Sequence, residues 1–276
     1  MDKNNNQDRK DVFFAGIDVG STTTKMVLLD FEKKIRVSSI IPTGPIIKKT
    51  VDKIINICFE KNLNKIDDIK YCVATGYGRE MVDLADEQIT EITCHAKGVN
   101  VIFPQAKMII DVGGQDSKVI SVDGNGSVLS FVMNDKCAAG TGRFLEVIAR
   151  SLELSIDEMA ILSRQSKKKV EVSSMCTVFA ESEVISLVSQ GVEVSDIAAA
   201  INRSIARRLV GLVQRIGLQL PLVMTGGVAQ NKGVVKAIED ALNIDILIST
   251  EPQLTGALGA AHIALQRFQE RSDSIE

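Results

Sequence analysis

The chain has 276 residues, 45% of them hydrophobic, which is enough for one large domain or two ordinary ones with a substantial core. Its 32 basic and 35 acidic residues give a formal net charge of −3, so electrostatics provide no reason to expect a nucleic-acid or membrane-surface partner. No apolar run is as long as a membrane span, and the N-terminus MDKNNNQDRKD lacks the apolar core of a secretory signal. We therefore expect a cytoplasmic protein that begins with a disordered tail over residues 1–10.

The first strand pattern in the chain has a near copy later on. Residues 16–25 read GIDVGSTTTK, and residues 109–118 read IIDVGGQDSK. The ungapped alignment keeps the run Asp-Val-Gly and a lysine at the last position. Each copy continues into a strand, a short polar turn and a further strand. This repetition predicts that the chain consists of two duplicated halves.

Helical and strand patterns alternate in both halves, which indicates an α/β sheet in each. For the long helix near residue 200, Ser195 is the predicted N-cap and Gly217 ends the helix. In chain order we expect helices over 46–60, 91–102, 142–152, 196–216, 231–242 and 257–270, with further strands over 71–74, 222–227 and 244–249.

Both copies of the repeat have the features of a loop that binds nucleotide phosphates. The glycine lets the backbone approach closely, and the amides and hydroxyls of the STTT run can surround anionic oxygens. Asp18 can hold magnesium through water, and Lys25 can offset charge nearby. A third Gly-rich turn, MTGGVAQNKG, follows a strand at 224–233. Neither GxxxxGK[ST] nor GxGxxG is present, so these turns predict a nucleotide site of another kind.

The ordered set GIDVGSTTTK, DVGGQDSK and TGGVAQN resembles the two phosphate motifs and the adenosine motif of the actin, sugar-kinase and chaperone ATPase superfamily. This resemblance implies an α/β fold in which two ribonuclease-H-like domains flank a nucleotide cleft. It implies a first domain over 11–104 and a second over 105–256, with the C-terminal helix 257–270 packed back on the first.

The same resemblance implies roles for individual residues. Asp18 and Asp111 would position magnesium and the attacking water. The second loop has Gln115 and Asp116 where the chaperone class has Gly and Thr, which makes Gln115 a candidate for orienting that water. The residues expected to bind ATP are Gly20, Ser21, Thr22, Thr23, Lys25, Gly113, Gly114, Gln115, Gly226, Gly227 and Gly256.

The five cysteines fall into two groups. Cys58 and Cys72 lie in apolar patterns typical of small buried residues, and Cys94, beside His95, has no partner at ligand spacing. Cys137 and Cys176 each precede a helix, where unpaired amides favour an anion and lower a thiol pKa. Two such cysteines do not complete a zinc or iron–sulfur site, which takes four ligands, but a two-fold dimer would supply the other two.

The segments KCAAGTGRFLE and SMCTVFAESEV resemble the cluster motifs of activators of 2-hydroxyacyl-CoA dehydratases and of related benzoyl-CoA reductase subunits. This resemblance implies an ATP-driven electron donor with one [4Fe–4S] cluster bridging a homodimer through Cys137 and Cys176. It implies ATP and Mg²⁺ as further cofactors, ferredoxin or flavodoxin as the electron source, and an iron–sulfur dehydratase as the partner.

Three alternatives stay open from the sequence. Within the same class, the chain would serve a benzoyl-CoA-type reductase or another low-potential cluster protein. A kinase of a small hydroxylated substrate belongs to the same superfamily but has no use for the two cysteines. A chaperone-like peptide binder would need an extra substrate domain.

Overall fold

The computed structural model describes residues 12–62, 66–172 and 177–274, so the expected tail and Cys176 lie outside the described residues. The chain divides into two compact units. The first comprises Met1–Gln105, Asp123–Val128 and Gln253–Glu276, and the second comprises Ala106–Val122 and Leu129–Pro252. No helix in the described part of the chain is long and apolar enough to cross a membrane.

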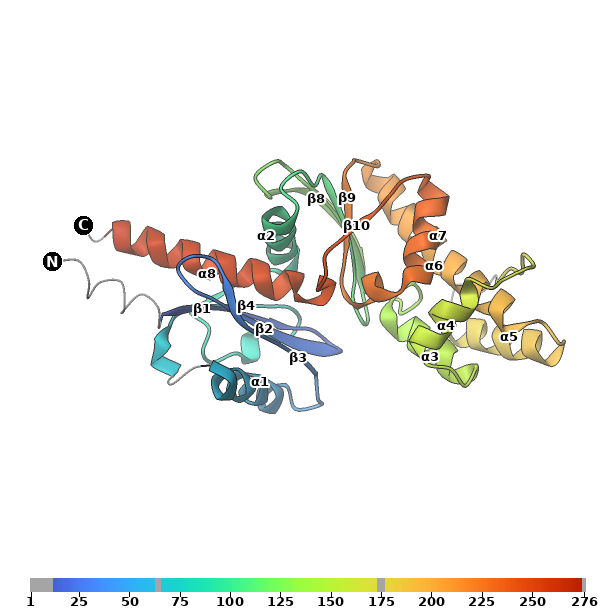
Figure 1. Cartoon of the computed structure of the whole chain (residues 1–276), viewed down its shortest axis with the longest axis horizontal. Helices are drawn as coiled ribbons and strands as arrows, with labels where there is room; N and C mark the ends of the chain where they lie inside the picture. The colour runs from blue at the N-terminus through green and yellow to red at the C-terminus, as the bar shows by residue number, and fades with distance from the viewer. Residues whose placement is uncertain (1–11, 63–65, 173–176, 275–276) are drawn as a thin grey trace. The chain divides into compact units, whose positions relative to one another are not determined.

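The first unit is built on a mixed five-stranded sheet with the order β3-β2-β1-β4-β5 (Figure 1). The strands β1, β2 and β3 form an antiparallel meander, and β4 lies parallel to β1 on its other side. Strand β1 is buried along its whole length, as its nearly continuous apolar sequence FFAGIDV requires. The bounds are β1 Phe13–Val19, β2 Thr23–Leu29, β3 Ile35–Pro42, β4 Ile69–Thr75 and β5 Glu87–Gln88.

Helices cover both faces of this sheet (Figure 1). Helix α1 (Ile47–Asn62) packs on one face, and α8 (Thr255–Asp273) packs on the other with α2 (Glu91–Ile102) beside it. The predicted helix over 91–102 is therefore confirmed, with Thr90 as its N-cap. The 3-10 turns are η1 Ile66–Asp68, η2 Arg79–Met81 and, leading into α8, η4 Pro252–Leu254.

Glycines allow α2 and α8 to touch backbone to backbone. A Cβ on Gly259 would lie 1.8 Å from the Cys94 carbonyl oxygen, and a Cβ on Gly98 would lie 2.1 Å from the Thr255 carbonyl oxygen. Neither distance leaves space for a side chain. Gly16 on β1 is equally close to α8, because its Cβ would lie 2.0 Å from the Ala257 carbonyl oxygen. The Ala- and Gly-rich start of α8 is thus what lets it lie directly on β1.

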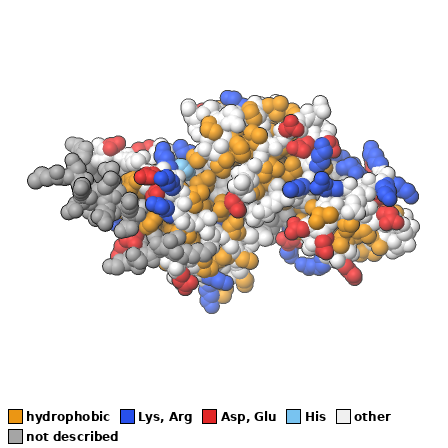
Figure 2. All heavy atoms as spheres, viewed as in Figure 1, with side chains coloured by type: hydrophobic (Ala, Val, Ile, Leu, Met, Phe, Trp, Pro, Cys, Tyr) orange, Lys and Arg blue, Asp and Glu red, His pale blue; other side chains and the backbone are white. Residues whose placement is uncertain are grey.

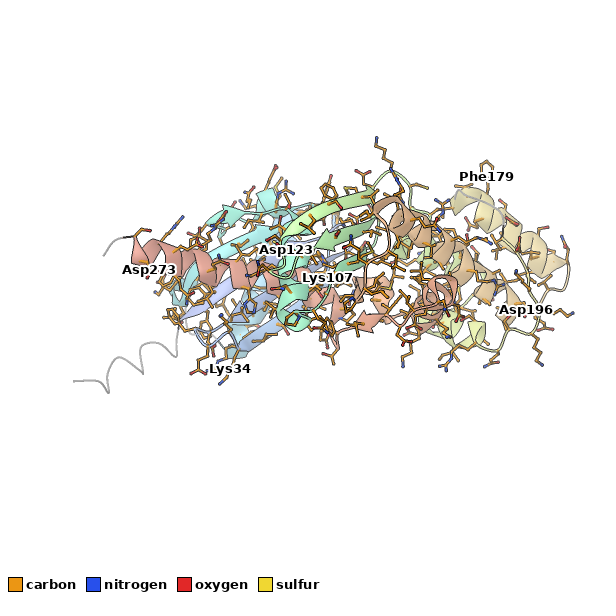
Figure 3. All side chains as sticks on the ribbon, turned by 90° about the horizontal axis from the view of Figure 1, so that it is seen from above. Lys34, Lys107, Asp123, Phe179, Asp196 and Asp273 are labelled. Atoms are coloured by element: carbon orange, nitrogen blue, oxygen red, sulfur yellow. The ribbon has the colours of Figure 1, made fainter. Side chains whose placement is uncertain are left out.

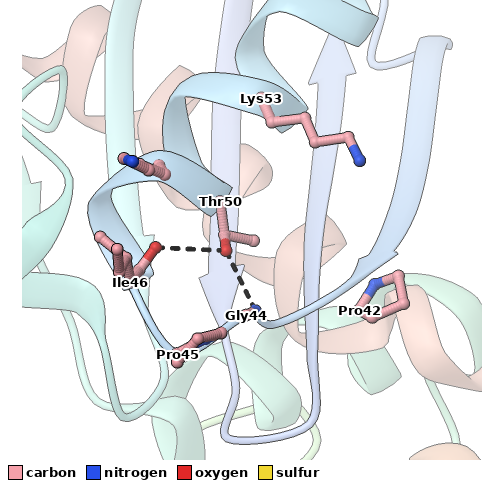
Figure 4. A pocket seen from close by; sticks show the side chains of 7 residues that line it. Pro42, Gly44, Pro45, Ile46, Thr50 and Lys53 are labelled. Atoms are coloured by element: carbon pink, nitrogen blue, oxygen red, sulfur yellow. Dashed lines mark hydrogen bonds between the residues drawn. The ribbon is translucent and has the colours of Figure 1, made fainter.

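Hydrogen bonds of Thr50 stabilise the turn before α1 (Figure 4). The Gly44 amide donates to Thr50 Oγ1 at 3.1 Å, and the Thr50 hydroxyl donates to the Ile46 carbonyl at 3.5 Å. Lys49 and Lys53 line the open pocket at this turn. The buried hydroxyl of Thr50 already accepts one hydrogen bond and donates another. We therefore interpret this pocket as part of the turn that begins α1 and not as a binding site.

The second unit has a sheet of the same design, with the order β10-β9-β6-β7-β8. Strand β6 pairs antiparallel with β7 and parallel with β9, as β1 does with β2 and β4. This common strand order confirms the predicted duplication. The bounds are β6 Met108–Val112, β7 Ser117–Val122, β8 Val128–Asn134, β9 Leu222–Thr225 and β10 Leu247–Ile248.

Helix α6 runs through the core of the second unit and contacts α4, α7 and β7. It begins at Val194 with Glu193 at the cap position, so the predicted N-cap Ser195 is wrong, whereas its end at Gly217 is confirmed. Asp196 instead accepts hydrogen bonds from the amides of Lys167 and Lys168 at 2.7 and 2.9 Å. The helices of this unit are α3 Gly142–Ser151, α4 Ile156–Ser163, α5 Thr177–Ser189, α6 Val194–Ile216 and α7 Lys232–Leu242, with the 3-10 turn η3 Gly227–Gln230.

Candidate functional site

The first phosphate loop connects β1 to β2 and is closed by a hydrogen bond from the Gly20 amide to the Thr23 carbonyl at 3.0 Å. Asp18 is the last residue but one of β1 and is only 3% exposed. Its Oδ2 lies 3.0 Å from the Nζ of Lys25, the residue opposite it on β2. A buried carboxylate is stable when it is paired in this way. The Asp18 carboxylate and the Lys25 ammonium group therefore lie together at the base of the loop, and Ser21 in the loop is exposed.

The second phosphate loop repeats this geometry. The Gly113 amide donates to the Asp116 carbonyl at 3.0 Å, and Asp111, also 3% exposed, lies opposite Lys118. Lys118 Nζ lies 3.4 Å from Asp111 Oδ2 and 2.8 Å from Asp116 Oδ2. Gln115 is exposed at the tip of the loop. The ion pair of Lys118 with Asp116 has no counterpart in the first loop, where Thr23 takes the equivalent place.

Each aspartate has a second neighbour that the sequence reasoning missed. On the parallel strand, Thr75 lies opposite Asp18 and Thr225 lies opposite Asp111. Each threonine is followed by a glycine with positive φ, +86° at Gly76 and +84° at Gly226. Side chains are excluded there, since a Cβ would come within 3.0 Å of the neighbouring aspartate in both cases. The similarity of CVATG to LVMTG was the signal that could have revealed this pair.

The two threonines differ in their hydrogen bonds. The Thr225 hydroxyl donates to Asp111 Oδ1 at 2.8 Å. The Thr75 hydroxyl is buried and has no oxygen or nitrogen partner among the described residues, although it lies near the weakly polar Cys94 thiol. Asp111 is therefore held on both oxygens by its own unit.

The glycines that the resemblance implies as ATP-binding come from both units. Gly226 and Gly227 follow β9 in the second unit, and Gly256 lies in the first turn of α8 in the first unit. A Cβ on Gly256 would lie 2.9 Å from His95 Nε2 and 3.2 Å from Asp18 Oδ2. Gly256 and His95 thus belong to the surroundings of Asp18, and His95 had no assigned role in the sequence reasoning.

The donors present fit magnesium held mainly through water. No group of three or more His, Cys, Asp or Glu side chains that could hold a metal occurs within residues 12–62, 66–172 and 177–274. Mg²⁺ commonly takes one or two carboxylates and completes its shell with water and substrate phosphates. Asp18 and Asp111, each buried at a strand end beside a phosphate loop, are carboxylates of this kind.

Cys137 differs from the other described cysteines. Cys58, Cys72 and Cys94 are fully buried, and burial raises the pKa of the Cys94 thiol to about 12 and that of Cys72 further still. Cys137 is partly exposed, in the segment between β8 and α3. It precedes Gly142, the first residue of α3, by five positions, so the prediction that Cys137 lies ahead of a helix is confirmed.

The start of α3 is hydrogen-bonded to the second phosphate loop. The Gly142 amide donates to the Gly113 carbonyl at 2.9 Å, and the Arg143 amide donates to the Gly114 carbonyl at 2.8 Å. Asn134 Nδ2 donates to the Cys137 carbonyl at 2.8 Å and so fixes the preceding segment to the end of β8. Cys137 therefore lies between two points that are both anchored to the sheet carrying Asp111.

Known proteins resemble the chain over nearly all of its length. The activator of lactoyl-CoA dehydratase from Anaerotignum propionicum is 48% identical over 265 residues, covering 94% of this chain and 100% of that protein. The (R)-2-hydroxyglutaryl-CoA dehydratase activating ATPase of Acidaminococcus fermentans is 46% identical over 257 residues, covering 93% and 98%. Among solved structures, the activator of the 2-hydroxyisocaproyl-CoA dehydratase from Clostridium difficile with bound ADPNP has a TM-score of 0.90 at 45% identity, covering 96% of this chain and 98% of that one.

These similarities confirm the predicted α/β fold class of actin-type ATPases. The model of the BadF/BadG/BcrA/BcrD ATPase family matches residues 15–264. The chain therefore belongs to the BadF/BadG/BcrA/BcrD ATPase family and is an ATPase.

Proposed function

We propose that the protein is a homodimeric, ATP-hydrolysing iron–sulfur protein that transfers a low-potential electron to a 2-hydroxyacyl-CoA dehydratase and so activates it. The observation that carries this proposal is the pair of hydrogen bonds from Gly142 and Arg143 to the second phosphate loop. These bonds connect a loop with the chemistry of phosphate binding to the segment that carries Cys137. A simple kinase of the same superfamily has no need for that connection.

The relatives favour this function over its alternatives. Two proteins more than 45% identical to the chain are named as activators of dehydratases that act on 2-hydroxyacyl-CoA thioesters. Service to a benzoyl-CoA-type reductase or to another low-potential cluster protein is the alternative within the same class. Ferredoxin or flavodoxin is the proposed electron source.

Two cysteines per chain are the proposed ligands of a [4Fe–4S] cluster. The protonated, buried thiols of Cys72 and Cys94 are poor ligands, because a metal binds the thiolate. Cys137 is accessible, and Cys176, which directly precedes α5, lies outside the described residues. The cluster would supply the one-electron chemistry, and two chains would give the four ligands that it needs.

The surface of α5 supports a contact between two copies. Val178, Phe179, Ile185 and Val188 on this helix are 64%, 68%, 52% and 43% exposed. Phe179 points outward from α5 (Figure 3), and apolar side chains are visible on the surface among charged ones (Figure 2). Exposed apolar residues grouped on one helix are typical of a protein interface. This helix begins one residue after Cys176, where a shared cluster would need the two chains to meet.

Iron analysis of anaerobically purified protein tests this proposal. We expect about four iron atoms per dimer, and none in Cys137→Ala or Cys176→Ala. Cys72→Ala and Cys94→Ser are matched controls, since they remove a thiol without removing a proposed ligand, and they should keep their iron. A full cluster on a monomer would contradict the shared site. Zinc in place of iron would contradict electron transfer.

The connection between loop and helix has its own test. A Cβ on Gly142 would lie 3.2 Å from the Gly113 carbonyl oxygen, so Gly142→Ala should push the start of α3 by a few tenths of an ångström. We expect ATP hydrolysis to continue in this variant while activation of a dehydratase by it falls. Gly211→Ala is the control, because an added Cβ there would meet no atom within 4 Å outside the neighbouring backbone of its own helix. Equal activation by Gly142→Ala and the unmodified protein would argue against coupling through this contact.

A further inference from the structure

Lys118 is an unusual residue for its position, because its side chain is only 1% exposed yet it carries a positive charge. Burial of a lysine is costly unless the ammonium group is paired. Here two carboxylates share it, Asp116 at 2.8 Å and Asp111 at 3.4 Å. The shorter distance is to Asp116, so the ammonium group lies closer to the loop residue than to the carboxylate at the base of the loop.

The shape of the loop is arranged around this ion pair. A Cβ on Gly113 would lie 2.6 Å from Asp116 Oδ1, so only a glycine leaves space for the Asp116 carboxylate to fold back under the loop. The Gly113 amide also donates to the Asp116 carbonyl at 3.0 Å. Both contacts keep Asp116 turned towards Lys118 rather than towards solvent, although its side chain is still 28% exposed.

The first loop shows what the arrangement would be without the second carboxylate. Thr23 stands at the position equivalent to Asp116, and Lys25 pairs with Asp18 alone at 3.0 Å. The distance from Lys25 to Asp18 in the first loop is thus shorter than the distance from Lys118 to Asp111 in the second. The additional acid in the second loop coincides with a longer bond between the lysine and the aspartate.

We propose that Asp116 is a positioning residue that draws Lys118 away from Asp111, so that the ammonium group offsets the Asp111 carboxylate less and this carboxylate attracts the magnesium bound with the nucleotide more strongly. This proposal rests on the proposed use of Asp111 in the ATPase reaction. Thr225 holds the other oxygen of Asp111 by a hydrogen bond and leaves its charge unchanged. Loss of Asp116 frees Lys118 to pair fully with Asp111, which weakens the attraction of that carboxylate for a divalent cation.

Calorimetric titration with ADP, with and without Mg²⁺, tests the proposal without depending on turnover. The quantity of interest is the ratio of the ADP affinity with Mg²⁺ to the ADP affinity without it. In Asp116→Asn we expect this ratio to fall by about 10–100-fold, as for other residues that support a metal ligand. ADP affinity without Mg²⁺ should stay the same or increase, because the loop has lost a negative charge. Asp245→Asn, which removes an exposed carboxylate elsewhere in the same unit, should behave as the unmodified protein.

The other outcomes are also decisive. If Asp116→Asn weakens ADP binding equally with and without Mg²⁺, Asp116 supports the loop structure and the proposal is wrong. An unchanged Mg²⁺ effect overturns it as well. Asp116→Ser is the second variant held to the same criteria, and failure of both variants to fold would also assign Asp116 a structural role. If the unmodified protein does not bind ADP with Mg²⁺ at all, the assignment of the phosphate loops fails instead.

Discussion

Replacement of Thr225 by Val should destabilise the second unit, whereas the same change at Thr75 should leave the first unit as stable or more stable. The Thr225 hydroxyl bonds a buried carboxylate at 2.8 Å, and a hydrogen bond to a charged group contributes about 1.5–3 kcal/mol. The Thr75 hydroxyl is buried without an oxygen or nitrogen partner in the described part of the chain. Its removal therefore relieves a desolvation cost rather than breaking a strong bond.

Urea unfolding of the two variants measures this difference. With a slope of about 1–3 kcal/mol per molar urea, the loss at Thr225 lowers the unfolding midpoint by about 1 M. The chain has no Trp and two Tyr, Tyr71 and Tyr77, both in the first unit, so tyrosine fluorescence follows that unit while circular dichroism follows both. The same loss of stability in both variants, or none in Thr225→Val, would refute the reasoning.

Three further groups of substitutions have defined outcomes. Asp18→Asn or Asp111→Asn should lower phosphate release from ATP by at least about 10–100-fold with the circular dichroism spectrum unchanged, because these carboxylates are proposed to serve magnesium; wild-type release in both would contradict the site. Gly259→Ala should cost about 1–3 kcal/mol or more in thermal or urea unfolding, since its Cβ would lie 1.8 Å from the Cys94 carbonyl oxygen. Gly211→Ala, inside α6, should stabilise the protein, since its Cβ would meet no atom within 4 Å outside the neighbouring backbone of its own helix. Burial, with Lys33 and Lys97 nearby, lowers the pKa of His262 to about 4. Between pH 6.5 and 4 the unfolded chain therefore binds more protons than the folded chain, so the free energy of unfolding falls as the pH falls through this range. His262→Gln should make this fall smaller, which urea unfolding at several pH values measures.

The architecture was accessible from the sequence because its signals are local. The copy of GIDVG in IIDVG predicted two similar halves, and both sheets have the same strand order. Helix α2 was predicted to the residue from its local helical pattern, and the structure adds Thr90 as its N-cap. The N-cap of α6 was missed because Glu193 occupies the cap position without a side-chain hydrogen bond, so the cap has no local sequence signal.

The candidate site was less accessible, because its decisive contacts join residues far apart in the chain. The hydrogen bond of Thr225 to Asp111 spans 114 positions, and the approach of Gly256 to His95 joins the C-terminal helix to α2. The sharing of Lys118 between Asp111 and Asp116 was hidden as well, since the alignment shows only that Lys118 corresponds to Lys25. The bonds of Gly142 and Arg143 to the second loop were likewise invisible, because they join two separate turns of the chain.

The two halves share a frame but surround their aspartates differently, and this difference bears on the chemistry. In both, the strand order puts an aspartate between a lysine on one neighbouring strand and a threonine on the other. Only Asp111 is held on one oxygen by its threonine and shares its lysine with a second acid. A carboxylate fixed in this way cannot easily rotate, which suits a constant position beside a metal ion, whereas Asp18 has its lysine on Oδ2 and lacks a bond from Thr75. We therefore expect the duplicated aspartates to be unequal, with Asp111 sensitive to loss of Asp116 and Asp18 insensitive to it.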